Sequence, residues 1–282
     1  MCLYQKLKRY FITATALGAI MLVCATGTFA GQIAKSKEVM RTGKLSIANG
    51  LNYAPFGYID DNGKPAGIMV ELGQATADLL GVKMDILKIP FPSMIPGLIS
   101  ERFELAWTTF TPNKDRLKTV GFVVFLNDGV ILSTKPENAA RFEGDHPMCG
   151  KKIGAMKGTV SDFALDKIIN QCESEGLPEL KRFLFDTLAD IVQATLSERV
   201  DAYFDDSSSA SYYASTSNGK LTTVGNIYNI SPLGVAFKKG DKATAEMIRN
   251  AFQMLMDSGA LPKILRKYGL AEAMTPKAYI VD

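Results

Sequence analysis

Short apolar segments alternate along the chain with segments whose apolar residues recur every three or four positions. The first pattern is typical of buried strands, and the second of helices that pack one face on a sheet. In the first half of the chain we expect strands at 45–49, 82–89 and 103–108, and helices at 70–80 and 93–101. Ser93 is the predicted cap of the second helix. Thr111 followed by Pro112 predicts the start of another short helix.

A second, comparable series follows residue 149. Its predicted strands are 152–156, 182–185, 201–205, 221–224 and 235–237, and its predicted helices are 159–172, 187–199, 207–215, 242–256 and 261–268. Strands that alternate with helices favour mostly parallel sheets flanked by helices, so the predicted fold class is α/β.

Two such series predict two lobes. The apolar stretch 122–133 is extended in character and is the predicted first crossing between them, and 226–233 is the predicted return crossing. We therefore assign 31–129 to the first lobe and 130–229 to the second. Residues 230–282 are expected to return to the first lobe and to form the C-terminal helices.

The N-terminal segment has the order of parts found in secretory signal peptides. Lys6, Lys8 and Arg9 form a basic start, the apolar run 11–23 follows, and small residues precede a predicted cut after Ala30. The apolar run of about 13 residues is short of the roughly 20 that a spanning helix needs. We therefore expect export to the periplasm.

Cysteine usage agrees with export. Cys24 would leave with the signal, and because Val23 precedes it where a small residue is expected, lipidation of Cys24 is the weaker alternative. Cys149 and Cys172 remain as an even pair in an oxidising compartment, which favours a disulfide over two buried free thiols. This wide spacing, with His146 as the single histidine, does not indicate a metal site.

Removal of residues 1–30 changes the charge of the chain. The segment contains three basic residues and no acids, so Lys+Arg falls from 32 to 29 against 29 acids. The predicted mature chain is near neutral, which gives no indication of a nucleic-acid partner or of an anionic membrane surface.

Ligands of open α/β sheets bind beyond the carboxyl ends of the strands, so the residues that follow each strand are the candidates. Thr109, Thr111 and Arg116 follow the strand at 103–108. A guanidinium can hold a carboxylate through two hydrogen bonds, and hydroxyls can satisfy the remaining lone pairs. The alternative is that Thr111 caps a helix and that Arg116 is a solvated surface residue.

Four further candidates follow other strands. A glycine turn at 157–159, ending in Thr159, opens a helix whose free N–H groups suit an anion, although such turns are common. Asp206 follows the strand at 201–205 and suits an ammonium group, or it is the N-cap of the next helix. Tyr53 and Phe91 lie in loops after early strands, where core packing is the simpler interpretation of an aromatic residue.

These candidates belong to a longer series of motifs. The stretches are 53–56, 67–72, 94–98, 103–106, 109–116, 158–159, 199–206, 234–240 and 261–269. Each is moderately specific, but in this joint order, over nearly all of 44–270, the chain resembles the amino-acid-binding family of bacterial extracellular solute-binding proteins. These are receptors of ABC uptake systems. Cys149 and Cys172 resemble a cysteine pair of one branch of this family.

The resemblance implies two lobes that close on a ligand, in a periplasmic-binding-protein-like fold with two hinge crossings. It also implies that Arg116 binds an α-carboxylate, helped by Thr109, Thr111 and the amides near Thr159, and that Asp206 binds an α-ammonium. In addition, Tyr53 and Phe91 would hold the ligand side chain between their rings. The implied partners are an amino acid and the membrane permease of an ABC transporter, with a monomeric protein and no cofactor.

Departures from the family pattern bear on the ligand. Relatives that bind basic amino acids have acids near the ligand side chain, and counting from Tyr53 places Gly50 and Met69 at these positions. A buried cation without an acidic partner is unfavourable, so we expect a neutral side chain. Lys157 would instead favour an acidic ligand if it pointed inward. Val160 replaces a hydroxyl residue, so one carboxylate contact reduces to a backbone amide.

Asp205, beside Asp206, is unusual for the family. Strand alternation predicts that the two carboxylates point to opposite faces, which would leave Asp205 a structural role. Two rival functions use the same fold: an exported dehydratase-like enzyme, and a sensory receptor that docks on a kinase. An enzyme needs a positioned acid or base, and His146 lies in a loop-like segment away from the strand ends, so no catalytic residue is assigned.

Overall fold

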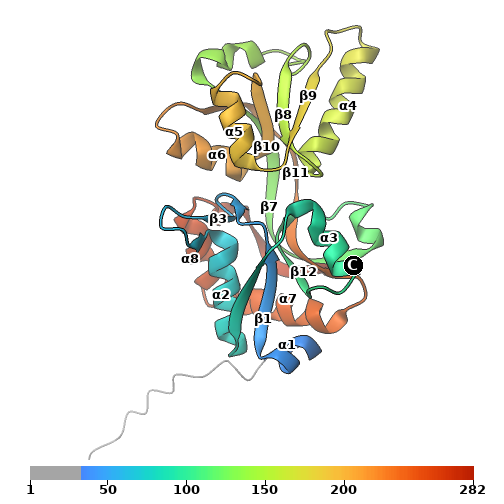
Figure 1. The fold of residues 1–282 in the computed structure, drawn as a ribbon, viewed down its shortest axis with the longest axis vertical. Coiled ribbons are helices and arrows are strands. Elements are labelled where there is room, and N and C mark those ends of the chain that lie inside the picture. The colour runs from blue at the N-terminus through green and yellow to red at the C-terminus, as the bar shows by residue number, and fades with distance from the viewer. Residues whose placement is uncertain (1–32) are drawn as a thin grey trace, which may run out of the picture.

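The computed structural model describes residues 33–282, so the predicted signal peptide, with Cys2 and Cys24, lies outside the described part. The fold is α/β, with two lobes that lie one above the other (Figure 1). Lobe 1 contains α1 (Lys37–Thr42), β1 (Lys44–Asn49), β2 (Asn52–Tyr53), β3 (Gly57–Ile59), β4 (Pro65–Ala66), α2 (Ile68–Leu80), β5 (Lys83–Lys88), α3 (Phe91–Ile99), β6 (Leu105–Phe110), η2 (Arg116–Lys118), α7 (Lys242–Asp257), α8 (Ala260–Lys267), η4 (Ala271–Ala273) and β12 (Met274–Val281).

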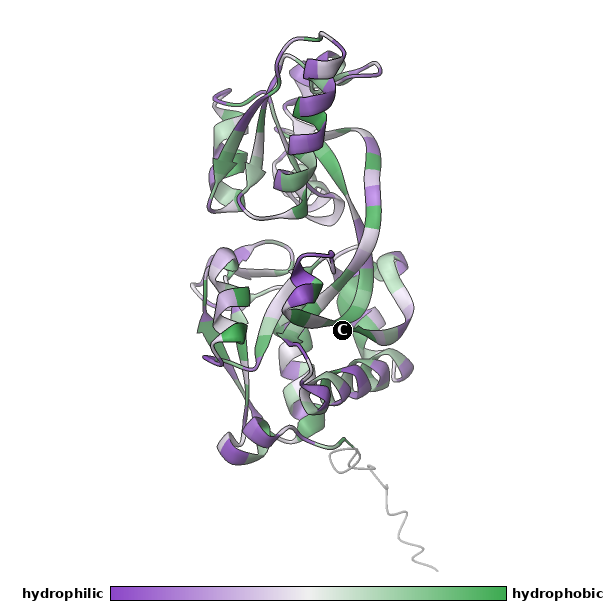
Figure 2. Ribbon diagram, turned by 90° about the vertical axis from the view of Figure 1, so that its right-hand side faces the viewer, coloured by the Kyte–Doolittle hydropathy of each residue, from purple (hydrophilic) through white to green (hydrophobic). Residues whose placement is uncertain are grey.

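Lobe 2 lies between the two long strands in the sequence. It contains η3 (Pro136–Phe142), β8 (Lys152–Met156), α4 (Val160–Ser174), β9 (Lys181–Phe185), α5 (Leu188–Leu196), β10 (Ala202–Asp206) and α6 (Ser207–Thr216). The long strands β7 (Val120–Thr134) and β11 (Thr222–Lys238) run through both lobes (Figures 1 and 2). The predicted crossings 122–133 and 226–233 form the middle of these strands. The lobe boundaries at 129/130 and 229/230 fall inside them and stay predictions.

The strand order is β5-β1-β6-β11-β7-β10-β8-β9, with β12 paired to β7. In lobe 1, β1 is parallel to β5 and β6, and in lobe 2, β8 is parallel to β9 and β10. The long strands pair antiparallel to each other and to their neighbours. The carboxyl ends of β1 and β6 in one lobe, and of β8 and β10 in the other, therefore meet at the interface between the lobes, where the site lies (Figure 1).

Helices cover both faces of the lobe 1 sheet. The side chains of β6 alternate between the two faces and therefore contribute to two apolar layers, one under each set of helices. Trp107 packs with α2, α7 and α8, and its ring lies 5.4 Å from that of Phe252, edge to face. Phe110 belongs to the opposite layer, beneath α3. Apolar residues concentrate on the strands, and polar residues on the outer faces of the helices (Figure 2). Within residues 33–282, no helix has the length and apolar character needed to cross a membrane.

The predicted disulfide is confirmed. Cys149 and Cys172 are bonded, with their Cα atoms 5.7 Å apart. The bond joins α4 to the loop that precedes β8, and Cys172 is fully buried in the lobe 2 core.

Four predicted elements are wrong in detail. Helix α3 begins at Phe91, two residues before the predicted cap Ser93, because a proline in the first turn lacks only an N–H that the helix does not use. No helix starts at Thr111; the chain turns later, where the Asn113 side chain accepts a hydrogen bond from the Arg116 N–H at 2.9 Å. The strands predicted at 221–224 and 235–237 are the two ends of β11.

Candidate functional site

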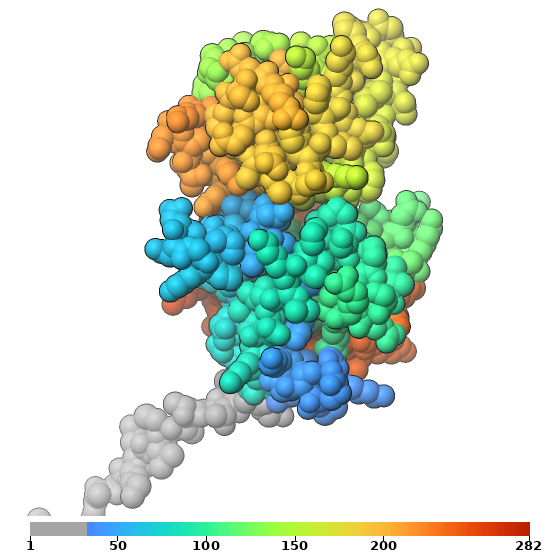
Figure 3. All heavy atoms as spheres, in the orientation of Figure 1, coloured from blue at the N-terminus to red at the C-terminus, as the bar shows by residue number. Residues whose placement is uncertain are grey.

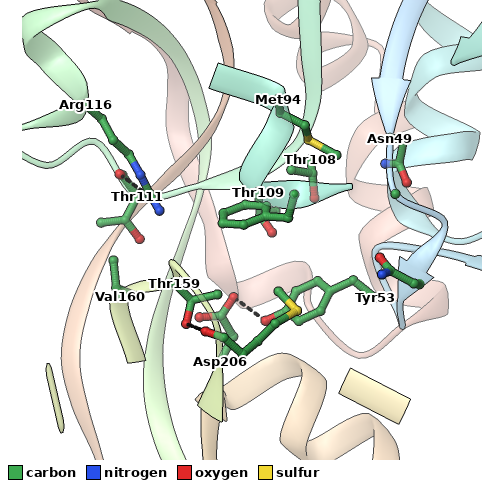
Figure 4. Close-up of a pocket in the computed structure, with 14 residues that line it drawn as sticks. Asn49, Tyr53, Met94, Thr108, Thr109, Thr111, Arg116, Thr159, Val160 and Asp206 are labelled. Atoms are coloured by element: carbon green, nitrogen blue, oxygen red, sulfur yellow. Dashed lines mark hydrogen bonds between the residues drawn. The ribbon is translucent and has the colours of Figure 1, made fainter. Parts of the chain in front are cut away.

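A pocket lies between the lobes, and the structure brings all seven predicted ligand-binding residues to its wall (Figure 4). They are Tyr53, Phe91, Thr109, Thr111, Arg116, Thr159 and Asp206. Asn49, Gly50, Asn52, Met94, Thr108, Met156 and Val160 complete the lining. The unfilled space between these residues, including its opening, is about 510 Å³. In the space-filling view the lobes meet across the front of the molecule, so the pocket is covered on that side (Figure 3).

Arg116 is the cation of the pocket. Its side chain leaves η2 and is only 8% exposed. Nη1 donates a hydrogen bond to the Thr111 carbonyl at 3.0 Å, and the guanidinium lies 5.3 Å from the centre of the Phe110 ring. Burial lowers the pKa of Arg116 to about 10, and the negative charge of Asp206 partly opposes this shift. Arg116 therefore remains a cation at neutral pH, with donors left for an anion.

Asp206 is the anion of the pocket and comes from the opposite lobe. It occupies the N-cap position of α6, but its side chain makes no capping hydrogen bond. Instead, Oδ2 accepts a hydrogen bond from the Tyr53 hydroxyl at 2.8 Å, across the cleft (Figure 4). Burial, with the nearby charge of Asp128, raises the pKa of Asp206, while the Tyr53 hydrogen bond and the Arg116 charge act in the other direction. A ligand cation at this position would stabilise the ionised carboxylate, which burial has deprived of solvent.

Asp205 does not lie where strand alternation predicts. Its Oδ1 lies 3.1 Å from the same Tyr53 hydroxyl that bonds Asp206, so the prediction that the two carboxylates separate to opposite faces is wrong. Strand β10 ends at Asp206 and α6 begins at Ser207, so the alternation of side chains stops there. Asp205 is nevertheless not among the residues that line the pocket.

The start of α4 forms another part of the wall. The Thr159 hydroxyl caps the helix, accepting from the Asp162 N–H at 3.3 Å and donating to the Met156 carbonyl at 2.7 Å. The hydroxyl of Thr159 is therefore already used within lobe 2. The N–H groups of Val160 and Ser161 belong to the first turn, where the helix itself supplies no acceptor, and suit a ligand anion.

Two threonines lie at the carboxyl end of β6 at the pocket: Thr109 is the last residue of the strand but one, and Thr111 directly follows the strand. The Thr109 hydroxyl is buried and has no hydrogen-bond partner among residues 33–282, so it is free for a polar ligand atom. Thr111 contributes its backbone carbonyl to Arg116, as described above, and its side chain faces the pocket.

Two aromatic rings lie at the pocket. Tyr53 stacks on Phe56 with ring centres 5.9 Å apart, and Phe91 stacks on Phe110 at 4.8 Å. Both Tyr53 and Phe91 also pack against apolar residues of lobe 2. The two rings therefore pack between the lobes, and each also lines the pocket.

The far end of the pocket is neutral. Gly50 lines it as predicted, next to Asn52 and Thr108. Asn49 holds the strand ends together, donating to the Trp107 carbonyl at 2.6 Å and accepting from the Leu51 N–H at 2.8 Å. Among the fourteen lining residues, Asp206 is the single acid and Arg116 the single base.

Two residues that bore on the predicted ligand lie elsewhere. Met69 is fully buried in the lobe 1 core, because α2 turns its side chain toward the sheet, and its placement near the ligand is wrong. Lys157 is exposed and does not line the pocket. The Nε2 atom of His146 lies 2.9 Å from the Glu175 carboxylate, also away from the lining residues.

Sequence reasoning missed five lining residues: Asn49, Asn52, Met94, Thr108 and Met156. Asn49 and Met156 are the last residues of β1 and β8, and Thr108 ends the predicted strand 103–108, so the rule that identified Thr109 could also have found them. Asn52 and Met94 have no signal of this kind in the sequence.

Several known amino-acid-binding proteins are similar in sequence to this chain. The chain is 25% identical, over 247 residues, to the arginine-binding protein ArgT of Corynebacterium glutamicum, with 86% of this chain and 80% of that protein covered. It is 24% identical, over 258 residues, to the L-cystine-binding protein TcyJ of Escherichia coli K12, with coverage of 89% and 94%.

The fold also matches solved structures. The crystal structure of the ancestral amino-acid-binding protein AncCDT-1, described as a precursor of cyclohexadienyl dehydratase, superposes with a TM-score of 0.73 at 27% identity, covering 82% of this chain and 97% of that one. The sequence model of the bacterial extracellular solute-binding proteins, family 3, matches residues 45–271. The chain therefore belongs to family 3 of the bacterial extracellular solute-binding proteins.

Proposed function

We propose that this protein captures an amino acid with a neutral side chain in the periplasm, by closing its lobes, and delivers it to an ABC importer as a monomer. The supporting observation is one cation and one anion, Arg116 and Asp206, brought from opposite lobes to a pocket that is otherwise neutral. A zwitterion that bridges the two charges gains most when the lobes are together.

The carboxylate of the amino acid would lie against Arg116, the Thr109 hydroxyl and the first-turn N–H groups of α4. Arg116 and Thr109 line the pocket, and the N–H groups belong to the first turn of α4, whose start also lines it. A buried carboxylate needs several charge-assisted hydrogen bonds to offset the loss of water. The ammonium group would lie against Asp206, close to the Tyr53 hydroxyl.

The ligand side chain would extend toward Asn49, Gly50, Asn52 and Thr108. This end of the pocket has amide and hydroxyl groups but no carboxylate. A lysine or arginine side chain would bury a cation there without a partner, which is strongly unfavourable. Several relatives carry names that refer to arginine, and we infer that this chain differs from them in its ligand.

Closure would act through a population shift, because the ligand has contacts with both lobes only in the closed state. Direct bonds already join the lobes beside the pocket. The Ser209 hydroxyl donates to the Ala54 carbonyl at 2.8 Å, and Arg116 Nη2 donates to the Gly158 carbonyl at 3.1 Å. The structure thus has the lobes in contact, as expected of a ligand-bound geometry.

Thermal unfolding of residues 31–282 with each of the twenty standard L-amino acids tests the proposal. A ligand that binds only the folded protein raises the midpoint by mass action. We expect one or a few neutral amino acids to raise it, and lysine and arginine to leave it unchanged. A shift with lysine or arginine would contradict the neutral pocket, and no shift with any amino acid would contradict the proposed ligand class.

An exported enzyme is the second candidate, since one similar structure is described as a precursor of a dehydratase. Turnover needs an acid or base with a suitable pKa within reach of the substrate, and Asp206, whose pKa is raised, is the one such group in the lining. Recovery of the bound compound after prolonged incubation distinguishes the two. An unchanged amino acid supports a receptor, and a converted product would support the enzyme.

A further inference from the structure

Asp205 is a buried acid that the proposed binding mode does not use. It is 1% exposed and does not line the pocket, so it would not contact the ligand directly. Its Oδ1 lies 3.1 Å from the Tyr53 hydroxyl, and its Oδ2 is buried with no hydrogen-bond partner in the part of the chain that the structure describes.

The Tyr53 hydroxyl has a single proton but faces two carboxyl groups. The oxygen of Asp206 is closer, at 2.8 Å, so the proton of Tyr53 belongs to that bond. If Asp205 were ionised, Oδ1 would face a hydroxyl oxygen without a proton to offer, and the backbone N–H of Asp206 would be the one donor left beside the carboxylate. A buried carboxylate in that position is strongly unfavourable.

We propose that Asp205 is a neutral carboxylic acid in the closed protein, donating its proton to the Tyr53 oxygen and thereby aiming the Tyr53 hydroxyl at Asp206. This chain of two hydrogen bonds uses every donor once. Asp205 is then a positioning residue: it does not contact the ligand, but it orients the Tyr53 hydroxyl beside the ammonium site. The inference rests on the proposed capture of an amino acid.

The charges around Asp205 agree with a bound proton. Burial raises the pKa of Asp205 well above its usual range, and the negative charge of Asp206 raises it further, while hydrogen bonds from the Asp206 backbone and the Tyr53 hydroxyl act in the other direction. Asp128, on β7, adds to this effect; its own carboxylate accepts hydrogen bonds from the hydroxyls of Ser207 and Ser208. The remaining titratable neighbours, Tyr53 from β2, Tyr203 on the same strand and Tyr213 on α6, all have pKa values raised by burial and stay neutral.

The arrangement exists only when the lobes are together, because Tyr53 belongs to lobe 1 and Asp205 to lobe 2. Opening removes the Tyr53 ring and admits water to Asp205, so its pKa falls toward the ordinary value of about 4. The closed form therefore binds more protons than the open form between these two pKa values. By linkage, capture of the ligand takes up a proton, and rising pH weakens binding.

Calorimetric titration in buffers with different protonation enthalpies measures this proton directly. The probe is the standard L-amino acid that gives the largest thermal shift. For the wild type at pH 7, we expect uptake that approaches one proton per ligand bound, and an affinity that falls up to tenfold for each unit of pH above 7.

Variants separate this role from a merely structural one. Asp205→Asn keeps a donor to Tyr53 without a charge, so we expect an affinity within about threefold of the wild type at pH 6, no proton uptake, and little change with pH. Asp205→Ala removes the donor, and we expect about tenfold weaker binding. In the matched control Asp145→Asn, at an exposed loop position, uptake should equal that of the wild type.

The outcomes also separate this inference from the proposed function. Binding without proton uptake, or with proton release, would overturn the role of Asp205 and leave amino-acid capture intact. Uptake that persists in Asp205→Asn would overturn it as well. If no standard amino acid binds the wild type at all, the proposed function fails and this inference fails with it.

Discussion

The Arg116 guanidinium reaches across the cleft, and its Nη2 donates a hydrogen bond to the backbone carbonyl of Gly158 at 3.1 Å. The other lobe thus holds one side of the cation, while Nη1 is held by the Thr111 carbonyl of its own lobe. A guanidinium has five N–H donors in a fixed plane, so donors remain for a ligand carboxylate. Arg116 can therefore join both lobes and the ligand in one network.

Replacement of this cation should weaken binding severely. In Arg116→Ala a bound carboxylate is buried without its partner, which we expect to cost about 2–5 kcal/mol, or roughly thirtyfold or more in affinity. Arg116→Lys should also bind weakly, because one ammonium group cannot reproduce the planar donors that reach Thr111, Gly158 and the ligand together. Isothermal titration measures both affinities, with circular dichroism to show that the variants fold. Wild-type affinity in Arg116→Ala would refute the site.

The ammonium site makes a prediction about the ligand as well as the protein. Asp206 is the single acid in the pocket lining, so an analogue of the bound amino acid that lacks the α-amino group should bind at least tenfold more weakly. Asp206→Asn should lower the affinity for the amino acid by a similar factor but leave the affinity for the analogue nearly unchanged. Competition titrations with both proteins measure the coupling between the two changes. Independent, additive losses would show that Asp206 does not contact the ammonium group.

Much of the site followed from one rule, that ligands bind beyond the carboxyl ends of strands. It identified Thr109, Thr159 and Asp206 from their positions after the predicted strands 103–108, 152–156 and 201–205, and the structure places all three at the pocket. The rule works because the strand pattern is set by local apolar residues, which the sequence displays directly. The helices between 159 and 216 were also predicted to within a few residues for this reason.

The parts that could not be predicted depend on contacts distant in the sequence. The strands β2, β3 and β4 have two or three residues each, too few to show a period, and β12 pairs with β7 from the far end of the chain. Met69 was misplaced because counting along the chain does not show which side of α2 faces the sheet. Asp205 meets Tyr53 only because the lobes come together.

The disulfide should stabilise lobe 2 without affecting the pocket. Neither Cys149 nor Cys172 lines the pocket, and the bond closes a loop of 23 residues in sequence separation. In the chain-entropy treatment, a loop of this size contributes about 3 kcal/mol to the free energy of unfolding. The double variant Cys149→Ala/Cys172→Ala should therefore unfold at a lower denaturant concentration, yet bind the amino acid with unchanged affinity below the unfolding transition. Loss of affinity in the folded variant would show that the disulfide positions the site.

Gly50 offers a direct test of why a neutral side chain is favoured. It lines the pocket, and a Cβ there would approach the end of the flexible Asn52 side chain, which can move aside. Gly50→Asp should therefore fold and add a carboxylate to the far end of the pocket. A hydrogen bond to a charged group contributes about 1.5–3 kcal/mol, so lysine or arginine binding should strengthen roughly ten- to a hundredfold, while the wild-type ligand weakens. The isosteric variant Gly50→Asn controls for size: it should show no gain for basic amino acids. Equal gains in both variants would mean that shape, and not the absence of an acid, excludes lysine and arginine from the wild-type pocket.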